Sequence, residues 1–469
     1  MSSTMLEEVR QSLLEEARRS PSLLSDLAGL EQYVAESYDA RSFVELLQNA
    51  DDAGASRFLV HRAGNLLLVA NDGRPFNRTD FESLCRSAAS HKHRGTSIGY
   101  RGIGFKSVVG FAETIYVFSG ELEVAFSRER TAEEIPEAYR VPLVRIPHPV
   151  EAEDRAGMAE AYEAMTQQGY RTTFVFTDLV ASGIEAEFAA FDPSSLLFLR
   201  HIRQVELRSS IEEVITARRE LLDARARSIR LASSGGTSSW RVVEREDVAL
   251  AFSEDDKEVK RLQEREAIVH AFLPTHEATG LPIKINGDIS TDPSRTRVIL
   301  DERTAAGIEG AARLIVDLVI EALDDSSGPA AAGLVASLVP FHDPRTVVFQ
   351  RRSFRTELLE AIKRVARDRF ENLKYQPSWL NPVDFEMFAA SSDLRAVPRG
   401  LEEIVGLSGF LRYMGAKEAT LADLEWGFRT SVPSPWRCGG CLAHHEAACD
   451  EANQRCGNRH GVAFVAARR

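Results

Sequence analysis

The segment Glu45–Ala53 carries polar side chains whose types and spacing fit phosphate chemistry. On a helix, Glu45, Asn49 and Asp52 lie at positions i, i+4 and i+7 and therefore share one face. The amide oxygen of an asparagine is a hard ligand that suits Mg²⁺, and a carboxylate one turn away can orient and deprotonate a water molecule. The same spacing also describes an ordinary solvated helix face, so this segment alone leaves both readings open.

A second polar segment, Asn71-Asp72-Gly73, comes directly after a strand-like apolar run. Gly73 permits a turn, and the side chains of Asn71 and Asp72 can accept hydrogen bonds from an exocyclic amine. Asn-Asp-Gly is also common in plain turns, so this motif predicts a nucleotide contact only in combination with others.

A glycine-rich loop lies at 95–104, directly before a predicted helix start at 105–110. Gly99, Gly102 and Gly104 let backbone N–H groups close around phosphates at the N-terminus of that helix, and Lys106 adds a positive charge there. A flexible turn is the alternative reading. Because no βαβ unit surrounds the loop and no Walker A motif occurs, neither a Rossmann site nor a P-loop is predicted.

The pattern of apolar residues predicts the elements that hold these three segments in place. Helical spacing occurs at 5–18, 39–53 and 78–89, where Asn77 or Thr79 can cap the helix, and a further helix starts within 105–110. Strand-like runs occur at 57–62, 66–71, 114–118, 122–127 and 172–177, with a turn at 63–65. For residues 20–180 they predict a two-layer α/β sandwich with helices on one face of a mixed, mostly antiparallel sheet.

The length of 469 residues predicts two or three domains. The strand candidates 202–208, 227–232, 239–246, 267–273 and 282–286, followed by a long helix at 303–324, predict a second α+β domain. Asp324–Pro329 is the best linker signal, and helical stretches follow it at 353–371, 400–413 and 419–425. The expected division is therefore 1–185, 186–325, a helical region at 331–435, and a Cys/His/Arg-rich tail at 436–469 with the composition of a disordered segment.

In their order and spacing, the three polar segments resemble the Bergerat-fold ATPases, the superfamily of gyrase, heat-shock protein 90, histidine kinases and MutL. The chain is most similar to the sacsin N-terminal type of the heat-shock protein 90 branch. The hallmarks of that type look like Glu-Leu-x-Gln-Asn-Ala-Asp-Asp-Ala and Ile-Gly-x-x-Gly-Ile-Gly-Phe-Lys-Ser-Val, and both stand in this sequence, at 45–53 and 98–108. The resemblance covers about 20–180 and implies an ATP-binding domain of the Bergerat fold.

The resemblance also implies a role for each matching residue, with ATP and Mg²⁺ as the bound groups. Glu45 would be the general base that activates water, Asn49 the Mg²⁺ ligand, and Asp52 a support of the nucleotide pocket. The lid around the phosphates would comprise Gly99, Gly102, Ile103, Gly104 and Phe105, with Lys106 near the γ-phosphate. Beside the adenine would lie Asn71, Asp72, Gly73 and Thr172.

On the adenine side the sequence departs from the family pattern at three positions. Asn71 stands where the family has the aspartate that reads adenine, and Pro75 replaces the second glycine of Asp-x-Gly-x-Gly. Arg171 replaces the glycine before Thr172. Asn71 can still accept a hydrogen bond from the adenine amino group, but only as a neutral acceptor, so Asn71 and Asp72 both remain candidates for this contact.

A further likeness to sacsin-type repeats lies beyond the first domain. A Gly-Leu-Pro stretch within 279–287 is followed by Asn-Gly and then by Arg295. Across the superfamily, a cationic side chain of the second domain often reaches the γ-phosphate, where it stabilises the charge that develops during hydrolysis. Arg295, or Arg297 beside it, is therefore a candidate catalytic residue. The alternative is a surface arginine in a polar turn.

Four of the five cysteines gather near the C-terminus, at Cys438, Cys441, Cys449 and Cys456. The first two have the spacing of half a zinc site, whereas the other two complete it with an unusual spacing, so Zn²⁺ is the lesser expectation. The low cysteine content fits a reducing compartment. Because neither a secretion signal nor a long apolar run occurs, the sequence predicts a cytoplasmic protein without a membrane span.

The expected function is a Mg-dependent ATP hydrolase that works as a chaperone-like conformational switch on an unknown client or partner protein. The net charge of −13 argues against direct nucleic-acid binding. Two alternatives stay open: an ATPase module of a nucleic-acid-acting or bacterial defence system, similar to MutL, and a nucleotide-binding scaffold without turnover. A homodimer would be typical of the superfamily. A histidine kinase is not favoured, because no helical phospho-acceptor histidine segment precedes the ATP motifs.

Overall fold

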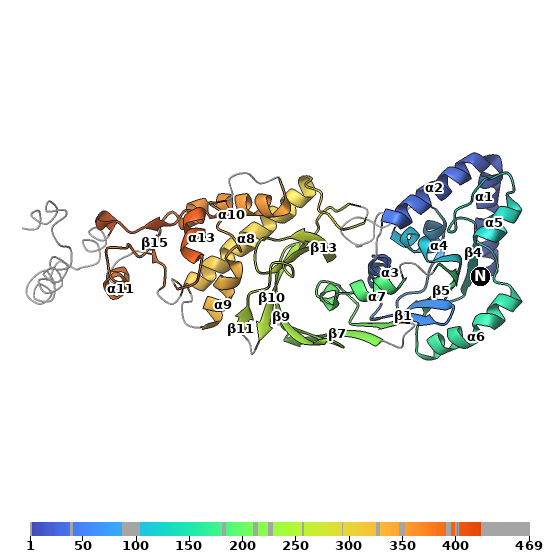
Figure 1. Ribbon diagram of the computed structural model, residues 1–469, viewed down its shortest axis with the longest axis horizontal. Helices are drawn as coiled ribbons and strands as arrows, with labels where there is room; N and C mark the ends of the chain where they lie inside the picture. The colour runs from blue at the N-terminus through green and yellow to red at the C-terminus, as the bar shows by residue number, and fades with distance from the viewer. Residues whose placement is uncertain are drawn as a thin grey trace, which may run out of the picture. The chain divides into compact units, whose positions relative to one another are not determined.

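The computed structural model describes residues 2–37, 41–86, 104–180, 184–209, 214–223, 228–255, 258–292, 294–324, 329–346, 352–390, 395–398, 401 and 403–423. The chain divides into two compact units, Met1–Val365 and Ala366–Arg469. The described structure is mixed α+β, with a large and mostly antiparallel sheet (Figure 1). The first unit contains the expected boundary at 185, and the division into domains on either side of it stays a prediction.

The helices and strands of the first unit have the following bounds. The helices are α1 Ser2–Arg19, α2 Pro21–Ser37, α3 Ser42–Asp52, α4 Arg78–Cys85, η1 Gly104–Gly110, α5 Arg128–Glu134, α6 Ala152–Gln167, α7 Ile184–Ala190, η2 Pro193–Leu196, α8 Glu302–Asp324, α9 Pro329–Leu338 and α10 Phe354–Phe370, whose last turns belong to the second unit. The strands are β1 Arg57–Ala63, β2 Leu66–Asn71, β3 Ala112–Ser119, β4 Leu122–Ser127, β5 Thr172–Leu179, β6 Gln204–Arg208, β7 Val214–Asp223, β8 Ser228–Ser233, β9 Gly236–Arg245, β10 Val248–Asp255, β11 Glu258–Lys260, β12 Ile268–Ala271, β13 Leu273–Ala278 and β14 Lys284–Gly287.

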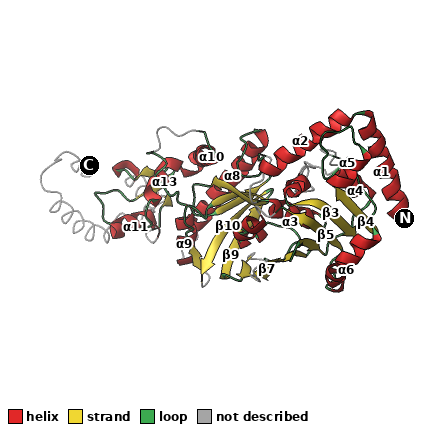
Figure 2. Ribbon diagram, turned by 45° about the vertical axis from the view of Figure 1, so that its right-hand side comes forward, coloured by secondary structure: helices red, strands yellow, loops and turns green. Residues whose placement is uncertain are grey.

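All these strands belong to one sheet in the order β13-β12-β14-β10-β9-β8-β7-β6-β1-β2-β5-β3-β4, with β11 paired to β10. Neighbours are antiparallel except for β1 with β6 and β12 with β14. The parallel pairing of β1 with β6 joins the strands that precede and follow the boundary expected at 185. The backbone ladder is therefore continuous between them. Figure 2 draws the strands of the sheet in yellow.

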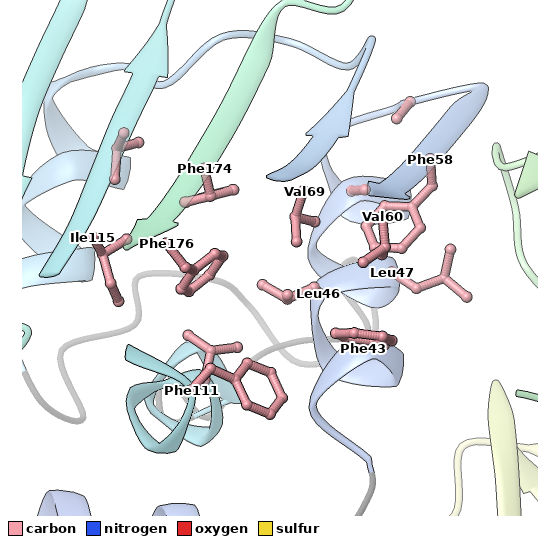
Figure 3. Close-up of a cluster of buried hydrophobic side chains, with 14 of the residues drawn as sticks. Phe43, Leu46, Leu47, Phe58, Val60, Val69, Phe111, Ile115, Phe174 and Phe176 are labelled. Carbon is pink, nitrogen blue, oxygen red and sulfur yellow. The ribbon is translucent and has the colours of Figure 1, made fainter. Parts of the chain in front are cut away.

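Helix α3 packs on the sheet because its apolar residues recur every three or four positions. Leu46 and Ala50 share that face and are buried, and Figure 3 shows the apolar side chains of α3 grouped with those of the neighbouring strands. Phe43 meets Phe111 of the segment after η1 edge-on, with ring centroids 5.8 Å apart. The helix face that carries Glu45 therefore points away from this apolar core.

The first half of the sheet has apolar residues on both faces. Phe58 and Val60 of β1 belong to the core that α1–α4 help to build, whereas Leu59 between them belongs to a second core. Met158 and Met165 of α6 complete that second core. Helices on one face only were expected; α6 corrects this expectation, because alternate strand residues on the opposite face are also apolar and need a cover.

Most of the elements near the motifs were predicted correctly. Asn77 caps α4 by accepting a hydrogen bond from the N–H of Asp80, and the Asp80 side chain accepts one in return from the N–H of Asn77. Residues 104–110 form a 3₁₀-helix where an α-helix start was expected. Strands β7 and β10 and helices α2, α5, α6 and α7 are among the elements that were not predicted. The middle of β7 and the last residues of β10 are polar or charged, which weakens the apolar pattern of a strand.

The second unit contains helices α11 Pro382–Ala390 and α13 Leu407–Met414 and the strands β15 Leu373–Tyr375, β16 Arg395–Ala396 and β17 Lys417–Glu418. The three strands form a parallel sheet in the order β16-β15-β17. An all-helical region was expected here, and the small sheet corrects that expectation. Strands of two or three residues are too short for a periodic sequence pattern. No helix in the described part of the chain combines the length and the apolar character that crossing a membrane requires.

Candidate functional site

Helix α3 is fixed at its N-terminus by a carboxylate from another helix. Glu187 of α7 accepts hydrogen bonds from the N–H groups of Ser42 and Phe43, at 2.7 and 3.1 Å. Negative charge at a helix N-terminus is favourable because it meets unpaired N–H groups and the positive end of the helix dipole. Burial raises the pKa of Glu187 to about 6, against the effect of these hydrogen bonds. The sequence motifs did not single out Glu187.

The other end of α3 is fixed by Asp51, which lies 1% exposed inside the motif. Its carboxylate accepts hydrogen bonds from the N–H groups of Arg200, His201 and Ile202, at 3.0, 2.7 and 2.8 Å. The segment that leads into β6 is therefore tied to α3 by charge-assisted hydrogen bonds. No role was predicted for Asp51 from the sequence, although an acidic residue beside the apolar face of an amphipathic helix is a signal that it has a buried partner.

The turn after β2 packs directly on the end of α3. The N–H of Arg74 donates to the carbonyl oxygen of Ala53 at 2.8 Å. A Cβ atom placed on Gly73 would lie 3.0 Å from both the Cβ and the carbonyl oxygen of Ala53, so these neighbours would have to give by a few tenths of an ångström. The close approach of the helix end therefore favours glycine at this position.

Asn71 and Thr172 lie directly opposite each other in the β2–β5 ladder, although 100 residues separate them in the sequence. Both side chains are buried. The Oδ1 atom of Asn71 accepts a hydrogen bond from the N–H of Gly73 at 3.1 Å, and the hydroxyl of Thr172 lies 2.6 Å from that of Ser119. The structure therefore brings together two of the four residues that were expected on the adenine side.

Asp72 faces a different set of partners. Its carboxylate accepts hydrogen bonds from the N–H and the hydroxyl of Ser56 at 2.7 and 2.6 Å, and from the N–H and Nε of Arg57 at 2.8 and 3.2 Å. Although burial acts in the opposite direction, these contacts lower the pKa of Asp72. Four donors occupy both carboxylate oxygens, so Asp72 serves the junction between α3 and β1.

Three aromatic side chains connect the segments that carry the motifs. The ring of Phe174 on β5 lies 5.0 Å from that of Phe105 and 6.1 Å from that of Phe76, measured between centroids. Phe105 follows the glycine-rich loop, and Phe76 follows the turn after β2. Gly99, Gly102 and Ile103 lie outside the described residues, as do the side chain of Lys106 and the cysteines Cys438, Cys441, Cys449 and Cys456. Gly104 is the first residue of η1.

Glu45 forms an ion pair with Arg295. The Nε of Arg295 donates a hydrogen bond to Oε1 of Glu45, and the two side chains are 14% and 6% exposed. Arg295 has a positive φ of 55° and sits in a loop that Asp292 organises by accepting from the N–H groups of Thr296 and Arg297, at 2.8 and 3.2 Å. Of the two arginines proposed from the sequence, Arg295 therefore reaches Glu45, whereas Arg297 is exposed.

A second guanidinium lies near this pair. Arg41, just before α3, donates a hydrogen bond through Nη2 to the carbonyl oxygen of Pro274. Burial lowers the pKa of Arg41. The negative charge of Glu45 acts to raise this pKa, and the positive charge of Arg295 acts to lower it further. Glu45 thus lies among cationic groups from both halves of the first unit.

Asn49 is half-buried on α3, one turn after Glu45. Its amide oxygen is the type of hard ligand that Mg²⁺ accepts, since this ion often takes one or two protein ligands and completes its shell with phosphate oxygens and water. Within the described ranges, no group of three or more His, Cys, Asp or Glu side chains is placed to hold a metal ion.

Comparisons with known proteins give one distant relative. No protein-family model matches the chain. The sequence is 25% identical over 294 residues to Protein NO VEIN of Arabidopsis thaliana, in a match that covers 56% of this chain and 10% of that protein. The chain therefore spans about a tenth of the length of this curated relative. Among solved structures, the crystal structure of the N-terminal domain of a DNA repair protein matches with a TM-score of 0.32 and 12% identity, over 59% of this chain and 94% of that one.

Proposed function

We propose that the first unit binds ATP with Mg²⁺ and hydrolyses it as a Bergerat-fold ATPase of the heat-shock protein 90 and sacsin type. The observation that carries this proposal is the convergence of α3, the turn after β2, and β5. Gly73 packs on Ala53 at the end of α3, and Asn71 faces Thr172 across the ladder. A common nucleotide site requires such convergence, whereas a chance likeness between separate motifs does not.

The proposed chemistry uses two residues one turn apart on α3. Glu45 would accept a proton from the attacking water, and Asn49 would hold Mg²⁺. When bound, Mg²⁺ neutralises the negative charge of the phosphates. Asp52, on the same face, supports the pocket. The lid residues Gly99, Gly102 and Gly104, and Lys106, belong to the proposal through the sequence motif alone.

For the adenine, the proposal favours Asn71 over Asp72. The carboxylate of Asp72 already accepts four hydrogen bonds, from Ser56 and Arg57. Asn71 lies beside Thr172 at the end of the β2–β5 ladder, and its oxygen has a second lone pair after accepting from Gly73. The adenine amino group would then donate a hydrogen bond to a neutral acceptor.

Arg295 has two partners in this proposal. In the structure it pairs with Glu45. With ATP bound, the γ-phosphate carries more negative charge than one carboxylate and competes for the guanidinium, which releases Glu45 to act as a base. Because Arg295 lies in the second half of the first unit, this exchange would couple nucleotide binding to a movement of that half, as expected of a chaperone-like switch.

Two other functions remain to be separated from this one by experiment. A module of a nucleic-acid-acting or defence system would bind DNA with an affinity that falls steeply with salt, whereas the net charge of −13 predicts no such binding. A scaffold would bind ATP without turnover. The presence of Glu45 favours hydrolysis, since simple binding needs no general base.

The test is Mg²⁺-dependent ATP binding and phosphate release by the full chain, compared with Glu45→Gln. Glu36→Gln is the matched control, because Glu36 is an exposed helical glutamate on α2. We expect binding in both variants, and turnover that Glu45→Gln lowers by about 100-fold or more while Glu36→Gln leaves it unchanged. Binding without turnover in the parental chain would support the scaffold. Absence of binding would reject the nucleotide site altogether.

A further inference from the structure

Gln48 is a buried polar residue on α3 to which the proposed chemistry assigns no task. Its side chain is 0% exposed, and neither Oε1 nor Nε2 has a hydrogen-bond partner in the structure. Buried amide groups are nearly always paired, because an unpaired donor or acceptor loses its hydration without compensation. An apolar side chain of similar length would suit a purely structural position better, so the amide indicates a polar partner from outside the protein.

The position of Gln48 identifies the site of that partner. Gln48 lies three residues after Glu45 and four before Asp52, so its side chain shares their face of the helix. Arg41, near the start of the same face, also has a buried Nε without a partner in the structure. Two polar side chains with unused hydrogen-bonding capacity therefore lie on the face of α3 that carries Glu45, and the charge of one of them, Arg41, interacts with the Glu45 carboxylate.

Glu187 and Asp51 fix both ends of α3, so this face has a defined position. Glu187 holds the first turn through Ser42 and Phe43, and Asp51, three residues after Gln48, holds the last turn. The glutamine amide cannot find a new partner by an easy shift of the helix. A small molecule with both donor and acceptor capacity must reach it, and water is the molecule that ATP hydrolysis brings to Glu45.

We infer that Gln48 is a positioning residue for the water that Glu45 activates. This inference rests on the proposed ATPase function. The Oε1 of Gln48 accepts a hydrogen bond from the O–H of the water that does not react, which directs the other O–H at Glu45 and a lone pair at the γ-phosphorus. Orientation of this kind lowers the entropic part of the barrier without tightening ATP binding.

Hydrolysis forms one bond at the γ-phosphorus and breaks another. The water oxygen forms a bond to the γ-phosphorus while the bond from that phosphorus to the bridging oxygen breaks, and the bonding electrons leave with ADP. The reacting proton passes to the carboxylate of Glu45, and the products are ADP and inorganic phosphate. Gln48 stays neutral throughout and exchanges no proton.

The test compares Gln48→Met with the parental chain in ATP binding, single-turnover hydrolysis and thermal unfolding. Methionine keeps the length of the side chain and removes its polar atoms. Ser337→Ala is the matched control, because Ser337 on α9 is also 0% exposed with a hydroxyl that has no partner in the structure. In Gln48→Met we expect an unchanged or higher melting temperature, an ATP Kd within about threefold of the parental value, and hydrolysis about 100-fold slower. Ser337→Ala should hydrolyse ATP at the parental rate.

Three results would overturn the inference, and they are distinguishable. Parental hydrolysis in Gln48→Met, with turnover that still requires Glu45, would reject the role of Gln48 and leave the ATPase proposal intact. Equal losses of ATP binding, melting temperature and rate would assign Gln48 a structural role. A parental chain that binds ATP but never hydrolyses it would reject the ATPase proposal, and the role of Gln48 with it.

Discussion

Arg295 donates a hydrogen bond to the carboxylate of Glu45, although 250 positions separate the two residues in the chain. The two charged groups form an ion pair, and both side chains are largely buried. Removing one partner of such a pair leaves a charge in a poorly hydrated site, and this costs far more than losing a surface ion pair. The contact therefore has consequences for stability that are independent of any activity.

We expect Glu45→Gln and Arg295→Met to lower the free energy of unfolding by roughly 3 kcal/mol each. The double variant should lose at least about 1 kcal/mol less than the sum, because neither charge is then left alone. Urea unfolding of the four proteins measures this coupling. Arg297→Met is the control, since Arg297 is exposed and should change stability by less than about 0.5 kcal/mol. Strictly additive losses would contradict the ion pair.

Asp51→Asn should destabilise the chain more than any other single aspartate change near α3. An asparagine oxygen can keep one or two of the three N–H groups from Arg200, His201 and Ile202, but without the charge. We expect a loss of about 2–3 kcal/mol in the free energy of unfolding. Asp26→Asn on α2 is exposed and is expected to change little. A result for Asp51→Asn within the range of that control would show that the three bonds contribute no net stability.

Much of the candidate site could be predicted from the sequence because its signals are local. The period of Leu46 and Ala50 predicts α3, and the run before Asn71 predicts β2. The pairing of Asn71 with Thr172 could not be predicted in this way. It depends on the register between two strands that lie 100 residues apart in the sequence, and neither residue type indicates that register. Thr172 was expected beside Asn71 only from the resemblance to a family motif, and its spacing in the sequence did not indicate this position.

The remaining residues of the site escaped prediction for physical reasons. Glu187 and Asp51 act on backbone N–H groups, which every residue carries, so their partners have no recognisable side-chain type. Asp72 was a candidate for the adenine contact because an aspartate can accept a hydrogen bond from the adenine amino group. In the structure its carboxylate instead accepts hydrogen bonds from Ser56 and Arg57, which set its orientation. Residue type limits the possible chemistry, and only the fold decides between the possible directions.

Substitutions of Asn71 and Asp72 should have different effects on nucleotide affinity and selectivity. We expect Asn71→Ala to weaken ATP binding about tenfold and to reduce the preference for ATP over GTP, because the acceptor for the adenine amino group is lost. Asp72→Asn should lower the free energy of unfolding by about 2 kcal/mol and leave the ratio of the ATP and GTP dissociation constants unchanged. Titration with fluorescent nucleotide analogues measures both ratios. A change in selectivity in Asp72→Asn alone would assign the adenine contact to Asp72.

His148 makes the stability of the first unit depend on pH. It is 2% exposed, its Nε2 lies 3.0 Å from the hydroxyl of Thr131, and burial lowers its pKa to about 4, although Glu134 at 3.6 Å acts in the opposite direction. An ordinary histidine has a pKa near 6.5, so between these values the unfolded chain binds the proton and the folded chain does not. The contribution of His148 to the free energy of unfolding is therefore fully present above about pH 6.5 and falls as the pH is lowered towards 4.

Between pH 7 and 4.5, His148 should account for a loss of about 2–3 kcal/mol in the free energy of unfolding. The measurement is urea unfolding of the parental chain and of His148→Gln at several pH values. Glu187, whose pKa burial raises to about 6, contributes the opposite slope between 6 and 4.5, but it is present in both proteins and cancels in the difference. The stability advantage of the parental chain over His148→Gln should shrink as the pH falls. A difference that stays constant over this range would mean that His148 keeps an ordinary pKa in the folded chain.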